Sequence, residues 1–198
     1  MELQFDMDKF IENLKKREEQ SIIEVMAFMS YNPSIGRVLE KGGVNIFQEM
    51  AIRKVDKLKE INTKKEFDAF HKKWMSEFID KIKTNKRLEG RKCSDGQAQK
   101  AINVFLKLFI DWAHLPDEKT AKRILPFLHV PLDKILMKYI KSEYTDFYKR
   151  EIKPLQKDNY SFSLSKVDEK TYNKWQNFFR EKYPQKPLLF DITWAINR

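Results

Sequence analysis

The chain lacks the features on which several protein classes depend. It has one cysteine, Cys93, in 198 residues, so neither an internal disulfide nor a cysteine-rich zinc site can form. Its three histidines are scattered, which gives no metal-binding pattern. No stretch approaches the roughly 20 apolar residues that span a bilayer, and residues 1–10 carry early acidic residues instead of the apolar run of a signal peptide. We therefore expect no metal and no membrane association, and a soluble, intracellular protein of the cytoplasm.

Glycine and proline are also scarce, at five and seven residues, and few segments alternate polar with apolar residues as half-buried strands do. Lysine- and glutamate-rich stretches instead carry an apolar residue every three or four positions, which is the spacing of one helix face. A hydrophobic content of 41% is that of a globular chain and excludes a disordered one. The sequence predicts an all-α fold, with one compact, two-lobed helical domain over residues 1–198.

Local signals place the helices along the chain. We expect them over about residues 5–30, 44–61, 63–83, 96–113, 117–126, 131–142, 168–183 and 187–196. The first carries a broken apolar stripe made of Phe10, Leu14, Ile22, Val25, Met26 and Met29. Thr63, Asp117 and Asp168 are expected N-caps, and Pro131 is expected at the first position of the helix over 131–142. Of the three histidines we consider His114 and His129, and interpret both as structural.

Positive charge is in excess, with 39 lysines and arginines against 29 aspartates and glutamates and a net charge of +10. Such a surplus favours a polyanionic partner, most often nucleic acid, although a merely solvated basic surface is the alternative. The segment between residues 84 and 95 is dense in positive charge. Its candidate phosphate contacts are Lys86, Arg87, Arg91 and Lys92.

The residue types best suited to chemistry stand at two expected helix starts. Lys100 lies near the beginning of the helix over 96–113, after backbone N–H groups around residues 96–98 that would form a phosphate cradle. A partly desolvated lysine there can attack an electrophilic carbon. Asp133 follows 33 residues later as a fixed anion, suited to activating a nucleophile or to stabilising a developing positive charge. Taken singly, they are interpreted as a solvated lysine and a helix cap; taken together, they are a candidate reactive pair.

Two short runs resemble a known family. Gly96-Gln97-Ala98-Gln99-Lys100-Ala101 is similar to the hairpin of the helix-hairpin-helix DNA glycosylases, which reads Gly-x-Gly-x-Lys in members with lyase activity. Val130-Pro131-Leu132-Asp133 resembles the Val-Pro-Val-Asp that carries their essential aspartate. Ala98 replaces the second glycine, and the spacing between the two runs is longer than in the 8-oxoguanine enzymes. The small size is closest to the compact archaeal-type 8-oxoguanine glycosylase/AP lyases.

The resemblance implies a function. A helix-hairpin-helix motif would occupy about residues 84–113, with Lys100 attacking C1′ of a flipped nucleotide to form a Schiff base and Asp133 assisting. Gly96 and Ala98 would shape the phosphate-binding turn, and Gln97 and Gln99 would face DNA. The partner would be double-stranded DNA with a damaged or modified base, either an oxidised purine or a hypermodified viral base, bound by a monomer without metal or other cofactor.

Two alternatives remain open at this point. The first is a non-enzymatic helix-hairpin-helix DNA-binding protein that uses the turn only to hold phosphates. The second is a helical protein–protein interaction module with lysine-rich surfaces.

Overall fold

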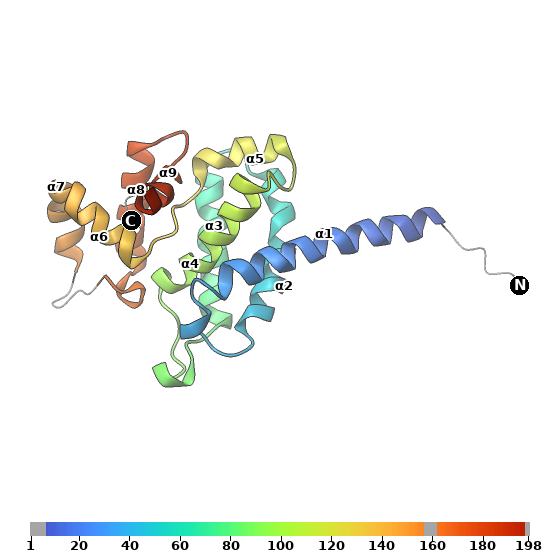
Figure 1. Ribbon diagram of the computed structural model, residues 1–198, viewed down its shortest axis with the longest axis horizontal. Coiled ribbons are helices and arrows are strands. Elements are labelled where there is room, and N and C mark those ends of the chain that lie inside the picture. Colours follow the sequence, from blue (N-terminus) through green and yellow to red (C-terminus); the bar gives the residue numbers. More distant parts are fainter. Residues whose placement is uncertain (1–6, 157–161, 197–198) are drawn as a thin grey trace, which may run out of the picture.

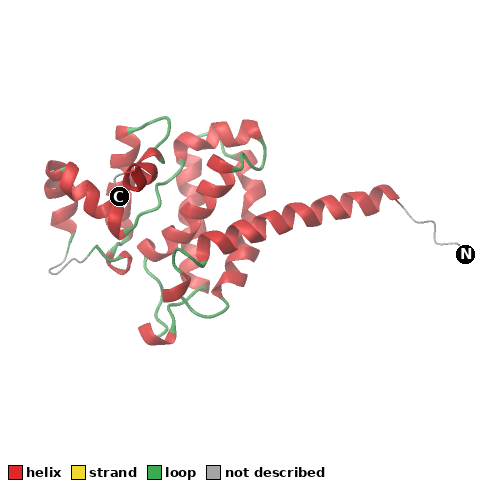
Figure 2. Cartoon of the chain, viewed as in Figure 1, coloured by secondary structure: helices red, strands yellow, loops and turns green. Residues whose placement is uncertain are grey.

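The computed structural model describes residues 7–156 and 162–196, and within these ranges the chain is all-α, as predicted, with no strand (Figure 2). The principal helices are α1 (Met7–Tyr31), α2 (Gly43–Val55), α3 (Lys64–Lys81), α4 (Asp95–Leu106), α5 (Glu118–Ile124), α6 (Lys134–Glu143), α7 (Thr145–Phe147), α8 (Glu169–Lys182) and α9 (Leu189–Ile196). Helices α2 to α5 gather around the C-terminal part of α1, while α6 to α9 form a second group beside them (Figure 1). The N-terminal part of α1 projects away from both groups.

The expected caps account for several helix starts. Thr63 forms a capping box with Glu66 at the start of α3, and Asp117 and Asp168 accept hydrogen bonds from the first-turn amides of α5 and α8. Gly42 stands before α2 with a φ of 91°, a backbone conformation that favours glycine. Short polar side chains thus place three of the helix boundaries that the sequence predicted.

Two boundaries differ from the predictions. The helix expected over 96–113 is α-helical only through Leu106 and continues as a π-helical segment, Lys107–Trp112. The helix expected to begin at Pro131 begins at Lys134, because Asp133 caps it from outside. The expectation that Asp133 lies just inside that helix is therefore wrong. Asp133 is the N-cap, and its carboxylate accepts a hydrogen bond from the Leu136 amide.

Buried apolar side chains form one connected cluster in the described part of the chain. Aromatic rings dominate it: Phe47, Trp74 and Phe105 contact one another where α2, α3 and α4 meet. Trp175 and Phe179 of α8 continue the cluster into the second group of helices. The elements that carry the candidate residues are therefore fixed by ordinary apolar packing.

Candidate functional site

Lys100 lies on the second turn of α4, and a local motif fixes the start of that helix. Ser94 accepts a hydrogen bond from the Gln97 amide, and the Gln97 side chain accepts one from the Ser94 amide, which is a complete capping box. The Lys100 side chain is only 12% exposed. A lysine that is withdrawn from water to this degree normally needs a partner.

That partner is Asp133, the other residue of the predicted pair. Asp133 Oδ1 accepts the first-turn amide of Leu136 at 2.8 Å, and Oδ2 accepts from Lys100 Nζ at 3.2 Å. The carboxylate thus caps α6 with one oxygen and binds the lysine with the other. Residues that are 33 positions apart in the sequence are brought together, as the reactive-pair interpretation requires.

The pair lines a cleft with a volume of about 760 Å³. Its walls come from the segment after α1, the start of α4, the start of α6, and the segment before α8. They consist of Pro33, Ser34, Ile35, Arg37, Val38, Gln97, Lys100, Asp133, Lys134, Ile135, Phe162, Ser163, Leu164 and Ser165. Three of these side chains are cationic and one is anionic, so the cleft suits a ligand with negative charge and some apolar surface.

The expected phosphate cradle at residues 96–98 is not available. The Gly96 amide donates to Val167 O at 3.0 Å, and the amides of Gln97 and Ala98 donate to Ser94. A Cβ on Gly96 would lie 2.3 Å from Leu164 O, so the glycine permits a close backbone contact and does not create an open turn. The expectation of free amides here is wrong because internal acceptors already satisfy them.

Gln97, Ala98 and Gln99 are also buried, which removes the expected DNA-facing positions of the two glutamines. Gln99 instead binds both backbone groups of Leu132. Its Nε2 donates to the Leu132 carbonyl, and its Oε1 accepts from the Leu132 amide, each at 3.1 Å. Leu132 directly precedes Asp133. Gln99 therefore fixes the segment that presents the carboxylate.

The four basic candidates before α4 divide into two kinds. Arg91 pairs with Glu89 and Lys92 pairs with Asp80, whereas Lys86 and Arg87 are exposed on a 3₁₀ turn and have no charged partner within the described residues. Asn85 ties this turn to the cleft, because it bonds Arg37 O through its side chain and Val38 O through its amide. The turn that carries Lys86 and Arg87 is thus joined to the segment of Arg37 and Val38, which lines one edge of the cleft.

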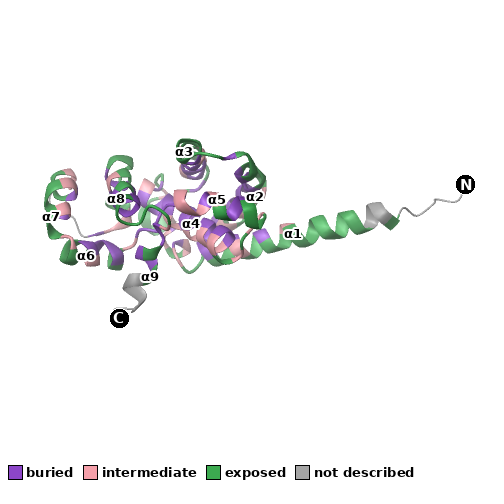
Figure 3. Cartoon of the chain, turned by 90° about the horizontal axis from the view of Figure 1, so that it is seen from above, coloured by how far each residue is buried: buried purple, intermediate pink, exposed green. Residues whose placement is uncertain are grey.

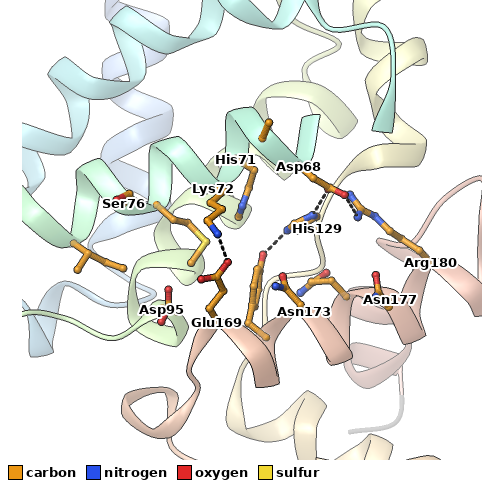
Figure 4. A pocket seen from close by; sticks show the side chains of 15 residues that line it. Asp68, His71, Lys72, Ser76, Asp95, His129, Glu169, Asn173, Asn177 and Arg180 are labelled. Atoms are coloured by element: carbon orange, nitrogen blue, oxygen red, sulfur yellow. Dashed lines mark hydrogen bonds and ion pairs between the residues drawn. The ribbon is translucent and has the colours of Figure 1, made fainter. Parts of the chain in front are cut away.

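A second polar cluster, which we did not anticipate, lies on a neighbouring face of α4. Figure 4 shows three of its members, Asp68, His71 and His129, around another cavity of about 470 Å³ between α3 and α8. We call it the buried network and define it by Asp68, His71, Asn103, His129 and Tyr172. All but Asp68 are at most 6% exposed, and the rings of His71 and His129 are 4.2 Å apart.

The partners in the buried network determine the direction of its hydrogen bonds. Asp68 accepts a hydrogen bond from His129 and binds two nitrogens of Arg180. These contacts hold the pKa of Asp68 below its usual range despite its partial burial. An ionised Asp68 can only accept, so His129 Nε2 donates to it at 3.0 Å. His129 Nδ1 must then accept from the Tyr172 hydroxyl at 2.6 Å, since a neutral imidazole has one donor.

The chain of donors extends beyond Tyr172. Asn103 Nδ2 donates to the Tyr172 hydroxyl at 2.9 Å, and Asn103 Oδ1 accepts from His71 Nε2 at 2.6 Å. Burial keeps both histidines neutral: it lowers the pKa of His71 to about 4 and that of His129 well below its usual range. Burial also raises the pKa of Tyr172. Each of these three groups is held in its uncharged form.

The structural interpretation of His129 agrees with this arrangement, because its two ring nitrogens are occupied by Asp68 and Tyr172. His71 was missed, although a signal existed in the sequence. It lies four residues after Phe67 and three before Trp74, on the face of α3 that the apolar spacing predicted to be buried. A histidine on such a face needs a polar partner, here Asn103, which no local pattern in the sequence could identify.

The described residues contain no group of three or more histidine, cysteine, aspartate or glutamate side chains that could hold a metal ion. Among the same residues, no helix is both long enough and apolar enough to cross a membrane. The chain matches no protein-family model, no curated protein and no solved structure.

Proposed function

We propose that the protein is a DNA glycosylase with an associated AP-lyase activity, with Lys100 as the nucleophile and Asp133 as the assisting carboxylate. The observation that supports this most directly is the 3.2 Å contact between Lys100 Nζ and Asp133 Oδ2 at the wall of a cleft. The similarity of the two runs around these residues to the helix-hairpin-helix glycosylases supplies the reaction type. The contact supports the pairing of a nucleophile with a carboxylate that the reaction would use.

The proposed reaction uses the two residues as acid–base and nucleophilic partners. Asp133 takes a proton from Lys100 Nζ, and the nitrogen lone pair then attacks C1′ of a flipped nucleotide. The bond between C1′ and the base breaks, and its electron pair leaves with the base, which is then protonated. The sugar opens to a protonated imine on Lys100, and loss of a C2′ proton expels the 3′ phosphate. The departing base receives the proton that Asp133 took from Lys100, and the carboxylate, ionised again, then stabilises the positive charge of the imine.

Several features of the cleft are compatible with a nucleotide. Its volume of about 760 Å³ lies within the range of roughly 300–1,000 Å³ that is typical of small-molecule sites. Arg37 and Lys134 line it beside the pair and would neutralise phosphates. Lys86 and Arg87 extend the positive charge outward from the same edge, through the Asn85 contacts. The substrate would be duplex DNA with a damaged or modified base, an oxidised purine or a hypermodified viral base.

The experiment that tests the proposal does not require the excised base to be known. Duplex DNA with one abasic site is incubated with the protein and sodium borohydride, which reduces an imine to a stable covalent bond. We expect a trapped protein–DNA adduct from the wild type. Lys100→Gln should lower the adduct yield at least about 1,000-fold, because the nucleophile is absent, and it should retain DNA binding.

A matched control is present on the same helical stretch. Lys107 is 14% exposed and pairs with Asp191, so it resembles Lys100 in burial and pairing but does not line the cleft. Lys107→Gln should keep the adduct. Loss of the adduct in both variants, or in neither, would contradict the assignment of Lys100.

The exposed pair Lys86 and Arg87 favours a second candidate, a DNA-binding protein without catalysis, since these residues would bind phosphates whatever the role of Lys100. Salt-dependent binding of the abasic duplex without adduct formation would support this candidate. Absence of binding even at low salt would reject both.

A further inference from the structure

Helix α1 is built differently from the rest of the molecule. Its C-terminal part packs on the body through Ile23, Ala27, Ser30 and Tyr31, which are buried. The remainder extends beyond the body, and every side chain from residue 11 to residue 19 is exposed (Figures 1 and 3). An isolated helix of this length is only marginally stable in water, because most helical stability in proteins comes from packing of an apolar face.

The exposed side of α1 carries such an apolar face. We call it the α1 stripe and define it by Met7, Ile11, Leu14, Ile22, Val25 and Met29. These side chains are between 41% and 57% exposed. At about 100° per residue they fall on one side of the helix, roughly 150° away from the face of Ile23, Ala27 and Ser30. The α1 stripe therefore runs the length of α1 on the side opposite its buried face.

The α1 stripe is symmetric about Glu18. Leu14 and Ile22 each lie four residues from it, and Ile11 and Val25 each lie seven residues from it. Met7 and Met29 complete the pattern at eleven residues on either side. A second α1 placed antiparallel, with a twofold axis beside residue 18, would put each apolar side chain against an apolar side chain. A twofold interface requires this self-complementarity, whereas binding of an unrelated protein does not.

Charge also distinguishes the possible partners. The same antiparallel register places Arg17 opposite Glu19 of the second copy twice, and it also places Glu18 against Glu18 and Glu12 against Glu24, so the charges do not add to the apolar self-complementarity. Within Met7–Tyr31 there are five acidic and four basic residues, a net charge of −1, although the whole chain carries +10. A helix that binds an anionic membrane has a polar face rich in lysine and arginine. The charge of α1 therefore disfavours an anionic lipid surface or a nucleic acid, and the choice of a second copy of this chain rests on the self-complementary α1 stripe.

We propose that α1 is a dimerisation helix, and that two copies of the chain associate through their α1 stripes in antiparallel orientation. The twofold axis passes beside Glu18, and the two bodies lie at opposite ends of the helix pair on opposite sides. This differs from the monomer that the sequence led us to expect. It does not depend on the reaction proposed for Lys100.

Sedimentation equilibrium of the full-length protein tests the association. The wild type should have about twice the chain mass of 23.9 kDa at micromolar concentration. Leu14→Glu combined with Ile22→Glu should raise the dissociation constant at least about 100-fold, because the axis would then bring together carboxylates that have lost their apolar contacts. The matched control is Leu88→Glu, an exposed leucine outside α1, which should leave the dimer intact. A wild type that is monomeric up to 100 µM, or a double variant that stays dimeric, would overturn the proposal.

Cross-linking tests the orientation. In an antiparallel pair Leu14 faces Ile22 of the other copy, whereas a parallel pair would place each residue against itself. A mixture of Leu14→Cys and Ile22→Cys proteins should therefore form a mixed disulfide under mild oxidation, at least about tenfold faster than either variant alone. The native Cys93 is buried and common to all samples. Faster cross-linking of Leu14→Cys with itself would overturn the antiparallel arrangement, and a monomer that sediments with anionic vesicles would replace it with membrane binding.

Discussion

Two polar clusters share α4, and they differ in how completely their hydrogen bonds are used. In the buried network, Asn103 alone contacts His71, Gln99, Val130 and Tyr172, so its amide donors and acceptor are all occupied by groups of the protein itself. In the cleft, Lys100 has three N–H donors and makes one hydrogen bond within the described residues. The buried network contains groups whose pKa values are shifted by burial, whereas the cleft has a lysine with N–H donors to spare at the wall of a cavity. Strong perturbation of titratable groups and spare hydrogen-bonding capacity therefore single out different sites in this chain.

The largest effect on stability should come from breaking the buried network at Asn103. Asn103→Ala removes four hydrogen bonds, leaves His71 and Tyr172 without their amide partner, and creates a small cavity. We expect a loss of about 3–5 kcal/mol in the free energy of unfolding, measured by urea denaturation. A loss below about 1 kcal/mol would show that the hydrogen bonds of Asn103 contribute little to the stability of the folded protein.

Acid should weaken the buried network in a defined pH range. The pKa of His71 falls from 6.5 in the unfolded chain to about 4 in the folded protein, so between these values the unfolded state binds more protons. Its contribution to stability is therefore fully present above pH 6.5 and is lost as the pH falls towards 4. The pKa of His129 is lowered as well, and it acts in the same direction.

We expect His71 alone to account for a loss of about 3 kcal/mol in unfolding free energy between pH 7 and pH 4. Urea denaturation over this range measures it, and the pH dependence should become shallower in His71→Gln. An unchanged pH dependence in that variant would assign the effect to other groups.

Asp133→Asn should separate catalysis from folding in the cleft. Asparagine caps helices as well as aspartate does, so the start of α6 should be retained, and the free energy of unfolding should fall by about 1–3 kcal/mol because Lys100 loses its charged partner. On the proposed reaction, loss of the carboxylate charge should slow adduct formation about 100-fold. The rate of borohydride trapping and a urea denaturation curve of the same sample check both parts. A variant that unfolds more easily but traps at the normal rate would make Asp133 a cap only.

The smallest effect concerns the edge of the cleft. Replacing Lys86 and Arg87 by glutamine should weaken binding of the abasic duplex about tenfold and reduce the salt slope by about two. The matched control replaces Arg91 and Lys92, which already pair with Glu89 and Asp80. Equal losses in both double variants would mean that the segment acts only through its net charge.

The predictions from sequence succeeded where the physics is local. Apolar spacing and capping side chains located α3, α5 and α8, because both depend on residues at most four positions apart. The proximity of Lys100 and Asp133 was anticipated from resemblance, not from local physics. The buried network was missed because it joins residues of α3, α4, α8 and the segment before α6. The Gly96 amide was misjudged for the same reason, since Val167 supplies its acceptor from 71 residues away.

Gly96 allows α4 to approach the segment that forms one wall of the cleft. The backbone of α4 and that of residues 164–167 touch at this position with no side chain between them, and residues 162–165 form one wall. The width there is determined by two main chains in van der Waals contact, which substitution of neighbouring side chains cannot alter. Selection for a larger or smaller ligand would have to act on the opposite walls, around Arg37 and Ile135. Any side chain at residue 96 would therefore push α4 away from the segment that forms this wall of the cleft.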